Sequence, residues 1–307
     1  MILQYAHLTN HPAAFRALTG VTIVQFNALC ADVLPSYVAA ERGRHARPDR
    51  LRAIGGGNQF TLALRDHLLL TVVWLRVYPT YPILGYLFGV SEYVAQRALG
   101  RVLPLLEAAG RDTMRLPDPG KGHRRTLDDL LRDTPDLAVL IDTFEQPVQR
   151  HKERGEADRH YSGKKKMHTS KTQVAVDERD GRIVDVGVSE PGPTADVCVL
   201  RRSGLLDRLP HGVGVVGDLA YVGMTKGYPG VQGAWPRRKP RDKPRPVDDV
   251  AYNTAFARRR VPVEHAIGRM RHFQAITQRD RQHRRAVTAR TRAVAGLVNR
   301  TNWRLTT

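Results

Sequence analysis

Three carboxylates stand where they could hold divalent cations. Asp142 ends an apolar run at residues 137–141, and Asp218 follows a second apolar run at residues 213–216. Short apolar runs predict buried strands, so each Asp is expected at or just past a strand end. Glu264 lies in a basic segment with helical spacing. Carboxylate oxygens suit Mg2+, and two cations about 4 Å apart can activate a nucleophile and neutralise a phosphoryl group.

Each carboxylate also has an ordinary structural interpretation. An Asp after a strand can form a turn or cap a helix, and Glu264 can pair with Arg260 or Arg271 on a helix surface. Pro262 predicts either a kink in that helix or the start of a new one. The sequence leaves these alternatives open.

Two further residues are candidates for a supporting role beside the cation ligands. Asp196 either stands behind the ligands or caps the helix that follows it, and the cap is the favoured interpretation. His265 follows Glu264 directly. The remaining carboxylates of this region, Asp177, Asp180 and Asp185, belong to an expected hairpin and should face solvent.

The charge of the chain narrows the class of partner. The 307 residues include 49 Lys and Arg against 30 Asp and Glu, a net charge of +19. Such an excess indicates a polyanion, with nucleic acid the first candidate and an anionic membrane surface the second. The longest apolar run, residues 68–75, is too short to cross a bilayer, and no charged leader opens the chain. The two cysteines lack zinc-site spacing. A cytoplasmic protein that acts on nucleic acid is expected, without a membrane partner.

Residues 60–101 have the pattern of a helix-turn-helix. A helix over residues 60–77 should stop before Pro79, and a short helix follows at residues 81–88. Gly89 and Ser91 predict a tight turn, with Ser91 as the N-cap of the next helix. The apolar residues expected at the contact are Ile83, Leu84, Leu87, Val94, Ala98 and Leu99. Such a corner either reads DNA or serves helix packing and dimerisation, and DNA contact is favoured here.

The second half of the chain alternates between strand and helix patterns. After the strand ending at Asp142, period-two alternation flanks Asp180-Gly181, which predicts a hairpin over residues 171–189. Residues 194–209 have helical spacing, and residues 213–216 form the next strand. This order predicts a mixed sheet whose first and fourth strands lie side by side with their ends in register.

Four segments together resemble a known family. They are residues 141–150 (IDTFEQPVQR), 161–169 (YSGKKKMHT), 217–223 (GDLAYVG) and 263–269 (VEHAIGR). In this order and at these spacings they resemble the DDE transposases of bacterial insertion sequences related to the PIF/Harbinger group. The resemblance covers residues from about 60 to 275.

The resemblance implies a fold, a reaction and a site. The fold would be α/β, an RNase H-like mixed five-stranded sheet flanked by helices and preceded by an all-α helix-turn-helix domain. The reaction would be cut-and-paste transposition, with two Mg2+ or Mn2+ ions held by Asp142, Asp218 and Glu264. The partners would be terminal inverted repeats and target DNA, bound by a homodimer or higher oligomer in the bacterial nucleoid.

The expected domains follow from these segments. They are a helical segment at 1–54, a helix-turn-helix domain at 55–116, a linker at 117–136, a catalytic domain at 137–275 and a basic C-terminal helix at 276–307, most basic over residues 279–292. The residues expected to contact DNA are Tyr93, Gln96, Arg97, Arg101, Arg150, Tyr161, Lys164, Lys165, Lys166, Arg237, Arg238, Lys239 and Arg271. Those at 237–239 begin a basic arm expected to be flexible. Their contacts should be mostly to phosphates and therefore sensitive to salt.

Other classes explain less of the sequence. A P-loop enzyme is disfavoured because Gly-x-x-x-x-Gly-Lys-[Ser/Thr] does not occur. A catalytically silent, domesticated transposase that binds DNA would not need all three carboxylates. An RNase H-like nuclease would share the carboxylates but would not need the helix-turn-helix.

Overall fold

The chain folds into two compact units. The computed structural model describes residues 2–46, 62–120, 127–283 and 286–302. The helical unit comprises Met1–Asp112, His272–Ile276 and Arg292–Thr307, and the sheet unit comprises Thr113–Arg271 and Thr277–Thr291. The first residues of the helix expected at 60–77 lie outside the described residues. The finer division into five segments stays a prediction.

The helical unit is built around one helix that is apolar on nearly every side. Its helices are α1 (Tyr5–Leu8), α2 (Pro12–Thr19), α3 (Ile23–His45), α4 (Leu64–Val77), α5 (Tyr81–Phe88) and α6 (Glu92–Arg111), joined by η3 (Gln274–Ile276) and the end of α11 (Ala286–Asn302). Residues 67–75 of α4 are all buried, which is typical of a core helix. A capping box between Thr22 and Gln25 starts α3.

Helices α5 and α6 form the expected helix-turn-helix corner. Gly89 ends α5 with a left-handed φ of 63°, and the Ser91 hydroxyl accepts a hydrogen bond from the Val94 amide to start α6. Leu84 is buried as expected. The expectation for Ile83 and Val94 is wrong, because they are 53% and 38% exposed. Neither side chain is therefore enclosed in the contact between the two helices.

Two glycines let α6 and α11 approach closely within the helical unit. A Cβ atom added to Gly296 would stand 2.3 Å from the Cα of Gly110. Gly296→Ala should therefore force the helices apart and cost about 1–3 kcal/mol, seen as a lower thermal midpoint. Gly100→Ala is the matched control: its Cβ would meet open space on α6, so stability should hold or rise. Equal midpoints for wild type and Gly296→Ala would contradict the close approach.

Helix α3 is long and apolar. By length and mean hydropathy alone, its segment Ile23–Arg44 could cross a membrane. Core helices of soluble proteins meet the same criterion. Asp32, on α3, pairs with Arg300 at 2.6 Å, so this helix carries a charged contact within the helical unit.

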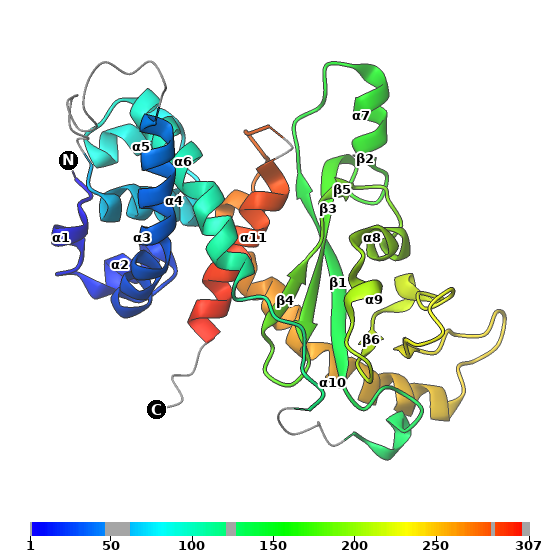
Figure 1. The fold of residues 1–307 in the computed structure, drawn as a ribbon. Helices are drawn as coiled ribbons and strands as arrows, with labels where there is room; N and C mark the ends of the chain where they lie inside the picture. Colours follow the sequence, from blue (N-terminus) through cyan, green and yellow to red (C-terminus); the bar gives the residue numbers. More distant parts are fainter. Residues whose placement is uncertain (1, 47–61, 121–126, 284–285, 303–307) are drawn as a thin grey trace. The chain divides into compact units, whose positions relative to one another are not determined.

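The sheet unit contains a mixed sheet centred on one long strand (Figure 1). Its strands are β1 (Ala138–Pro147), β2 (Tyr161–Ser162), β3 (Met167–Asp177), β4 (Ile183–Val186), β5 (Glu190–Pro191), β6 (Gly214–Val216) and β7 (Gly233–Ala234). Within the described residues the order is β2-β3-β1-β6-β7, with β4 and β5 also paired to β3. The sheet, its flanking helices and the helical region before it confirm the expected α/β class.

Strand β1 has a different partner on each side. It runs antiparallel to β3 along its length, and it runs parallel to β6 only from Ala138 to Leu140. This confirms that the first and fourth expected strands lie side by side. Beyond Leu140, the edge of β1 that faces β6 is no longer in the ladder, which leaves room for other groups there.

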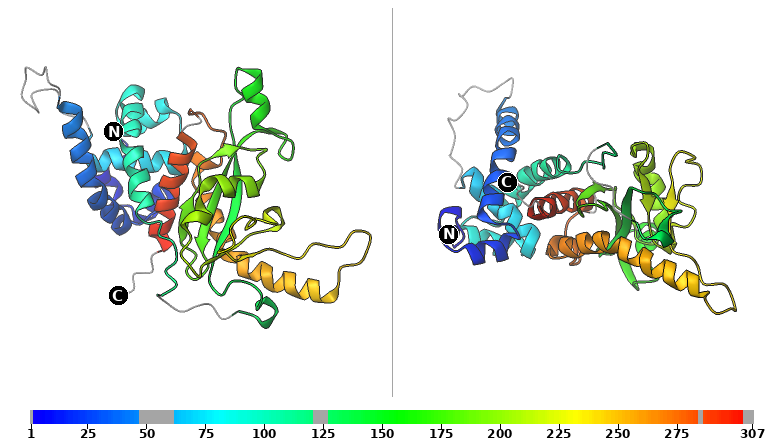
Figure 2. Two further views of the ribbon diagram at one scale, coloured as in Figure 1. Left: turned by 45° about the vertical axis from the view of Figure 1, so that its right-hand side comes forward. Right: turned by 90° about the horizontal axis from the view of Figure 1, so that it is seen from below.

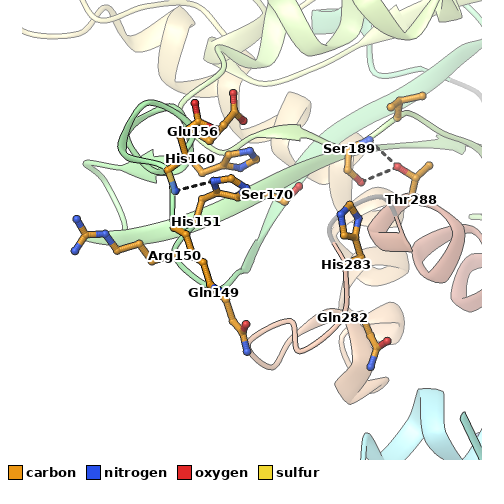
Figure 3. Close-up of a pocket in the computed structure, with 13 residues that line it drawn as sticks. Gln149, Arg150, His151, Glu156, His160, Ser170, Ser189, Gln282, His283 and Thr288 are labelled. Carbon is orange, nitrogen blue, oxygen red and sulfur yellow. Dashed lines mark hydrogen bonds between the residues drawn. The ribbon is translucent and has the colours of Figure 1, made fainter.

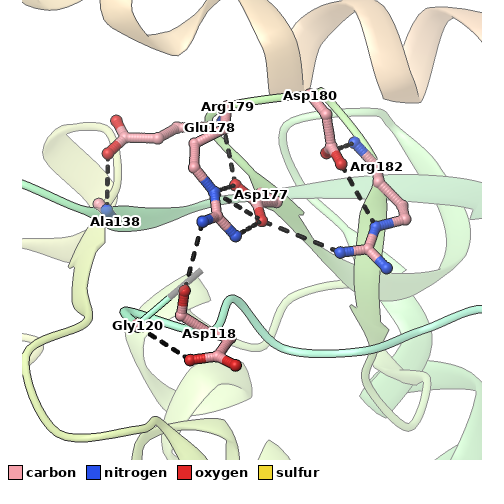
Figure 4. Close-up of polar contacts among 8 residues, drawn as sticks. All are labelled: Asp118, Gly120, Ala138, Asp177, Glu178, Arg179, Asp180 and Arg182. Atoms are coloured by element: carbon pink, nitrogen blue, oxygen red, sulfur yellow. Dashed lines mark hydrogen bonds and ion pairs between the residues drawn. The ribbon is translucent and has the colours of Figure 1, made fainter. Parts of the chain in front are cut away.

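The hairpin between β3 and β4 is confirmed, but two of its carboxylates do not face solvent. The Asp185 side chain is only 14% exposed and pairs with Arg208. Gly181 adopts the left-handed φ of 70° that the turn requires. Asp177 is fully buried, and its oxygens accept hydrogen bonds from the Arg179 side chain, the shortest at 2.7 Å (Figure 4). The expectation that Asp177 and Asp185 face solvent is therefore wrong, and the pKa of Arg179 is raised chiefly by this hydrogen bond.

Helices cover both faces of the sheet. On one face, α8 (Asp196–Ser203) and α9 (Leu205–Arg208) supply Leu200, Leu205 and Leu206 to a core shared with β1 and β6. The single helix expected over residues 194–209 is broken by Gly204, at φ 65°. On the other face, α10 (Val247–Met270) packs on β1 and β3. Figure 2 shows the first part of α10, with the loop before it, extending beyond the sheet. Short segments complete the unit: α7 (Arg154–His160), η1 (Asp129–Leu131) and η2 (Leu219–Tyr221).

Candidate functional site

Asp142 lies inside β1, past the last residue that β6 pairs. Its Cα partner is Val174 on β3, and β1 continues to Pro147. The expectation that the strand ends at this Asp is therefore wrong, because pairing with β3 extends β1 by five residues. The Thr143 amide donates a hydrogen bond of 2.8 Å to Asp142 Oδ1. The carboxylate is thus oriented by its own strand.

Asp218 lies just past the end of β6, as expected. It is the N-cap of the short helix η2, and its Oδ1 accepts a hydrogen bond of 2.8 Å from the Ala220 amide. The parallel pairing of β6 with β1 stops at Leu140 and Val216, so Asp142 and Asp218 each follow the last pair by two residues. The two carboxylates therefore lie at the same edge of this ladder. The expectation that the two strands end in register is wrong, because β1 continues to Pro147.

Neighbouring charges shift the pKa of Asp142. Burial raises the pKa of Asp142, while the Thr143 amide and the Arg260 guanidinium lower it. The negative charges of Asp218 and Asp196 raise it further, and the net shift is upward. Asp218 and Asp196 are therefore close enough to Asp142 for their charges to disfavour its ionised form.

A buried ion pair fixes α10 against the sheet. The Arg259 guanidinium lies on both oxygens of Glu178, with Nε–Oε2 at 2.8 Å and Nη2–Oε1 at 3.0 Å. It also donates to the Thr134 hydroxyl and the Pro135 carbonyl. Glu178 accepts a further hydrogen bond from the Ala138 amide at the start of β1 (Figure 4). These contacts fix the position of α10 relative to the start of β1.

This anchor places the next residue, Arg260, on Asp142. Arg260 Nη2 lies 3.5 Å from Asp142 Oδ2. Glu264 follows one helical turn later and is exposed, as is His265. Pro262 lies inside α10, which runs unbroken from Val247 to Met270. The structure thus brings Asp142 and Asp218 together with Arg260, and leaves Glu264 one turn along the same helix.

Asp196 belongs with this group and does not cap α8. The N-cap of α8 is Ala195, without a side-chain hydrogen bond. Asp196 Oδ1 instead accepts from the Thr143 hydroxyl at 3.0 Å and lies 2.8 Å from Lys171 Nζ. The favoured interpretation as a helix cap is wrong, because two neighbouring strands supply better donors. Through Thr143, Asp196 steadies the residue that orients Asp142.

Tyr221 is a site residue that sequence reasoning missed. Its ring is fully buried in the core, and its hydroxyl has no hydrogen-bond partner among the described residues. Burial, followed by the charges of Asp196, Asp142 and Asp218, raises the pKa of Tyr221 well above its usual value. The hydroxyl therefore stays protonated, as a donor beside three carboxylates. Its position three residues after Asp218 was the available signal.

The residues expected to contact DNA on α6 form an outward-facing group. Tyr93, Gln96 and Arg97 are exposed, and Arg101 is half-buried. Tyr93 is 67% exposed although it is aromatic. A helix surface with this composition suits contact with DNA bases and phosphates.

The residues around α7 surround an open cavity of about 940 Å3 (Figure 3). Arg150 lines it, together with three histidines, His151, His160 and His283. Tyr161 lies at the end of α7 and packs edge-on against His168. Lys164, Lys165 and Lys166 are exposed in the turn that follows. These cations are free of the core and accessible to a phosphate backbone.

The two later basic segments are more ordered than expected. The Arg237 guanidinium lies over the Tyr252 ring at 4.3 Å and pairs with Asp249 at 3.2 Å, so the start of the arm is held against α10. Arg238, Lys239 and Arg271 are exposed. The basic helix expected over residues 279–292 is wrong in its extent, because α11 begins at Ala286. Within it, Arg290 is fully buried and pairs with Asp280 at 2.7 Å.

Comparison with known proteins decides the family. Residues 141–299 match the family model described as DDE superfamily endonuclease, which is more than half of the chain. Residues 60–112 match the model described as the helix-turn-helix of DDE superfamily endonuclease.

The chain belongs to the DDE superfamily endonucleases. It is 26% identical over 285 residues, 93% of each chain, to a protein of Microchaete diplosiphon described as a probable transposase for insertion sequence element IS702. No solved structure matches it. The family resemblance inferred from the four sequence segments is confirmed.

DDE superfamily endonucleases generally use divalent metal ions, and the chemistry of this site suits them. Asp142 and Asp218 offer oxygen ligands only, which hard cations prefer. Burial and the neighbouring negative charges make the ionised form of Asp142 costly without a cation, and the buried Tyr221 hydroxyl has no hydrogen-bond partner among the described residues. In the described part of the chain no three Asp, Glu, His or Cys side chains stand close enough to hold an ion as they are. The residues fit, provided that side chains turn toward the ion.

Proposed function

We propose that this DDE endonuclease is a transposase that cuts DNA at the ends of its own insertion element and joins the freed 3'-hydroxyl to target DNA. The observation that carries the proposal is the placement of Asp142 and Asp218 two residues past the last pair of the parallel strands β1 and β6, where the charge of Asp218 raises the pKa of Asp142. The similarity to a probable transposase runs over 93% of both chains.

In this proposal Asp142, Asp218 and Glu264 hold two Mg2+ or Mn2+ ions. The ions would lower the barrier to attack on a phosphodiester by activating the nucleophile and neutralising the phosphoryl charge. Glu264 is exposed one turn beyond Arg260, so a change of rotamer would turn its carboxylate toward the site. The Thr143 amide keeps Asp142 oriented, and the buried Tyr221 hydroxyl, unpartnered among the described residues, would donate to an oxygen that enters the site.

The two parts of the chain would divide the work. Residues 55–116 would recognise the terminal inverted repeats, and residues 137–275 would cut and join the strands. Two element ends must be held together before joining, so a homodimer or higher oligomer is proposed. The protein would act on the bacterial chromosome in the cytoplasm.

Recognition of element ends by α6 gives a specific prediction. Arg97→Gln should weaken binding to a duplex carrying an element end by about tenfold, because a guanidinium contact to a base or phosphate is lost. Arg111→Gln removes the same charge from an exposed site at the end of α6 and should have little effect. Fluorescence anisotropy at fixed salt measures both. Equal losses for the two variants would contradict a recognition role for Arg97.

The activity itself is tested with a plasmid that carries the element. Purified protein and Mg2+ should release 3'-hydroxyl ends at the element boundaries and insert them into a second plasmid, and EDTA should abolish both products. Tight binding of the ends without any cleavage would instead indicate a silent DNA-binding protein. Cleavage of an RNA–DNA hybrid without element ends would indicate an RNase H-like nuclease.

A further inference from the structure

Two neighbouring arginines of α10 have unequal partners. Arg259 is almost fully buried, and its guanidinium makes four hydrogen bonds to Glu178, Thr134 and Pro135. Arg260 is also largely buried, with 12% of its side chain exposed. Among the described residues its guanidinium makes one ion pair, to Asp142 at 3.5 Å, and its Nε is buried without a hydrogen-bond partner.

Arg260 is therefore held in an incompletely satisfied position. A guanidinium carries five N–H donors in a fixed fork that matches two oxygens of a carboxylate or phosphate. A buried charge with unused donors is costly, since desolvation is not offset by hydrogen bonds. The geometry indicates that the Arg260 guanidinium could bind a further anionic group.

Arg260 also occupies the oxygen that a cation would need. Asp142 Oδ1 accepts the Thr143 amide, and Oδ2 faces the Arg260 guanidinium. A divalent cation on Oδ2 would meet the positive guanidinium at short distance, where the two charges repel. The guanidinium therefore competes with a cation for this oxygen.

We propose that Arg260 is the resident counter-ion of Asp142, that a divalent cation displaces it, and that the released guanidinium pairs with a phosphate of the bound DNA. The inference rests on the proposed function, because it assigns the cation to Asp142. It makes cation binding and DNA binding mutually reinforcing, since each ligand removes a cost that the other would meet. Before both are present, the ion pair offsets the charge of Asp142.

The first test measures Mn2+ uptake by the full chain without DNA, from the electron paramagnetic resonance signal of the free ion. Arg260→Gln should bind Mn2+ about tenfold more tightly than wild type, because a positive charge no longer competes with the cation for Asp142. Arg258→Gln removes the same charge from an exposed position of the same helix and should stay within about twofold of wild type. Unchanged or weaker Mn2+ binding by Arg260→Gln would overturn the displacement.

The second test needs no metal. In EDTA, Asp142→Asn should bind a DNA duplex about tenfold more tightly than wild type, because Arg260 is released to a phosphate. In the Arg260→Gln background the same substitution should give little gain. Asp218→Asn, which removes a carboxylate that has no ion pair with Arg260 among the described residues, should give a smaller gain than Asp142→Asn. An equal gain from Asp142→Asn in both backgrounds would overturn the proposal.

The two tests separate this inference from the proposed function. If Asp142→Asn abolishes Mn2+ uptake while Arg260→Gln behaves as wild type, the cation site stands and the displacement by a cation is wrong. If wild type takes up no Mn2+, the proposed cation site fails, and displacement of Arg260 by a cation fails with it. The measurements in EDTA then still decide whether Asp142 holds Arg260 away from DNA.

Discussion

Replacement of Asp142 by asparagine is expected to lower the rate of DNA cleavage by about a thousandfold and to leave the fold intact. Asparagine keeps an oxygen that can accept the Thr143 amide, so the strand is not disturbed. It loses the charge that would hold a cation. That charge supplies several kcal/mol of transition-state stabilisation, and each 1.36 kcal/mol is a factor of ten in rate.

The matched control for this variant is Asp129→Asn. It removes the same charge in the same unit from a side chain that is 83% exposed, and it should cleave at the wild-type rate. The measurement is the initial rate of strand cutting on an element-end duplex at saturating Mg2+, with thermal midpoints for both variants. Cleavage by Asp142→Asn at the rate of Asp129→Asn would remove Asp142 from the reaction.

Replacement of Arg259 by methionine is expected to destabilise the sheet unit by about 3–5 kcal/mol, because Glu178 would remain buried without a partner. Glu178 is fully buried and has two of its contacts on Arg259. Cleavage should fall as well, since α10 sets Arg260 against Asp142 and bears Glu264, the third proposed ligand. The free energy of unfolding, from urea titration followed by circular dichroism, measures the loss.

Two further variants identify the cause. Arg258→Met changes the preceding, exposed arginine and should alter stability by no more than about 0.5 kcal/mol. Arg259→Met combined with Glu178→Gln should recover at least half of the loss, since no charge is then buried and the side-chain carbonyl of the glutamine still accepts the Ala138 amide. A double variant as unstable as Arg259→Met alone would show that the packing of Arg259, and not the unpaired charge, is what matters.

Local patterns predicted most elements because their causes are local. Ser91 caps α6, Gly181 turns the hairpin and Asp218 follows its strand, as expected from residues a few positions away. The wrong predictions concern features that are determined by contacts with distant segments of the chain. Strand β1 continues past Asp142 because β3 pairs with it. Asp196 does not cap its own helix because its carboxylate contacts Thr143 and Lys171 on neighbouring strands.

The candidate site was predictable in part for the same reason. An Asp that ends an apolar run shows itself in the sequence, and both aspartates predicted in this way follow the last pair of β1 and β6. Tyr221 was missed because an aromatic residue in a core pattern carries no sign that its hydroxyl lacks a partner. Arg237 was expected in a flexible basic arm, whereas Asp249 and the Tyr252 ring hold it.

The sequence by itself determined the order of strands and helices, the two aspartates and the family, because these depend on residue type and short spacing. It could not separate Arg258, Arg259 and Arg260, three identical side chains in a row. Tertiary packing exposes the first, buries the second on Glu178 and sets the third against Asp142. The partner of a charge is decided by which distant segment the fold brings within a few ångströms, and no local pattern records that.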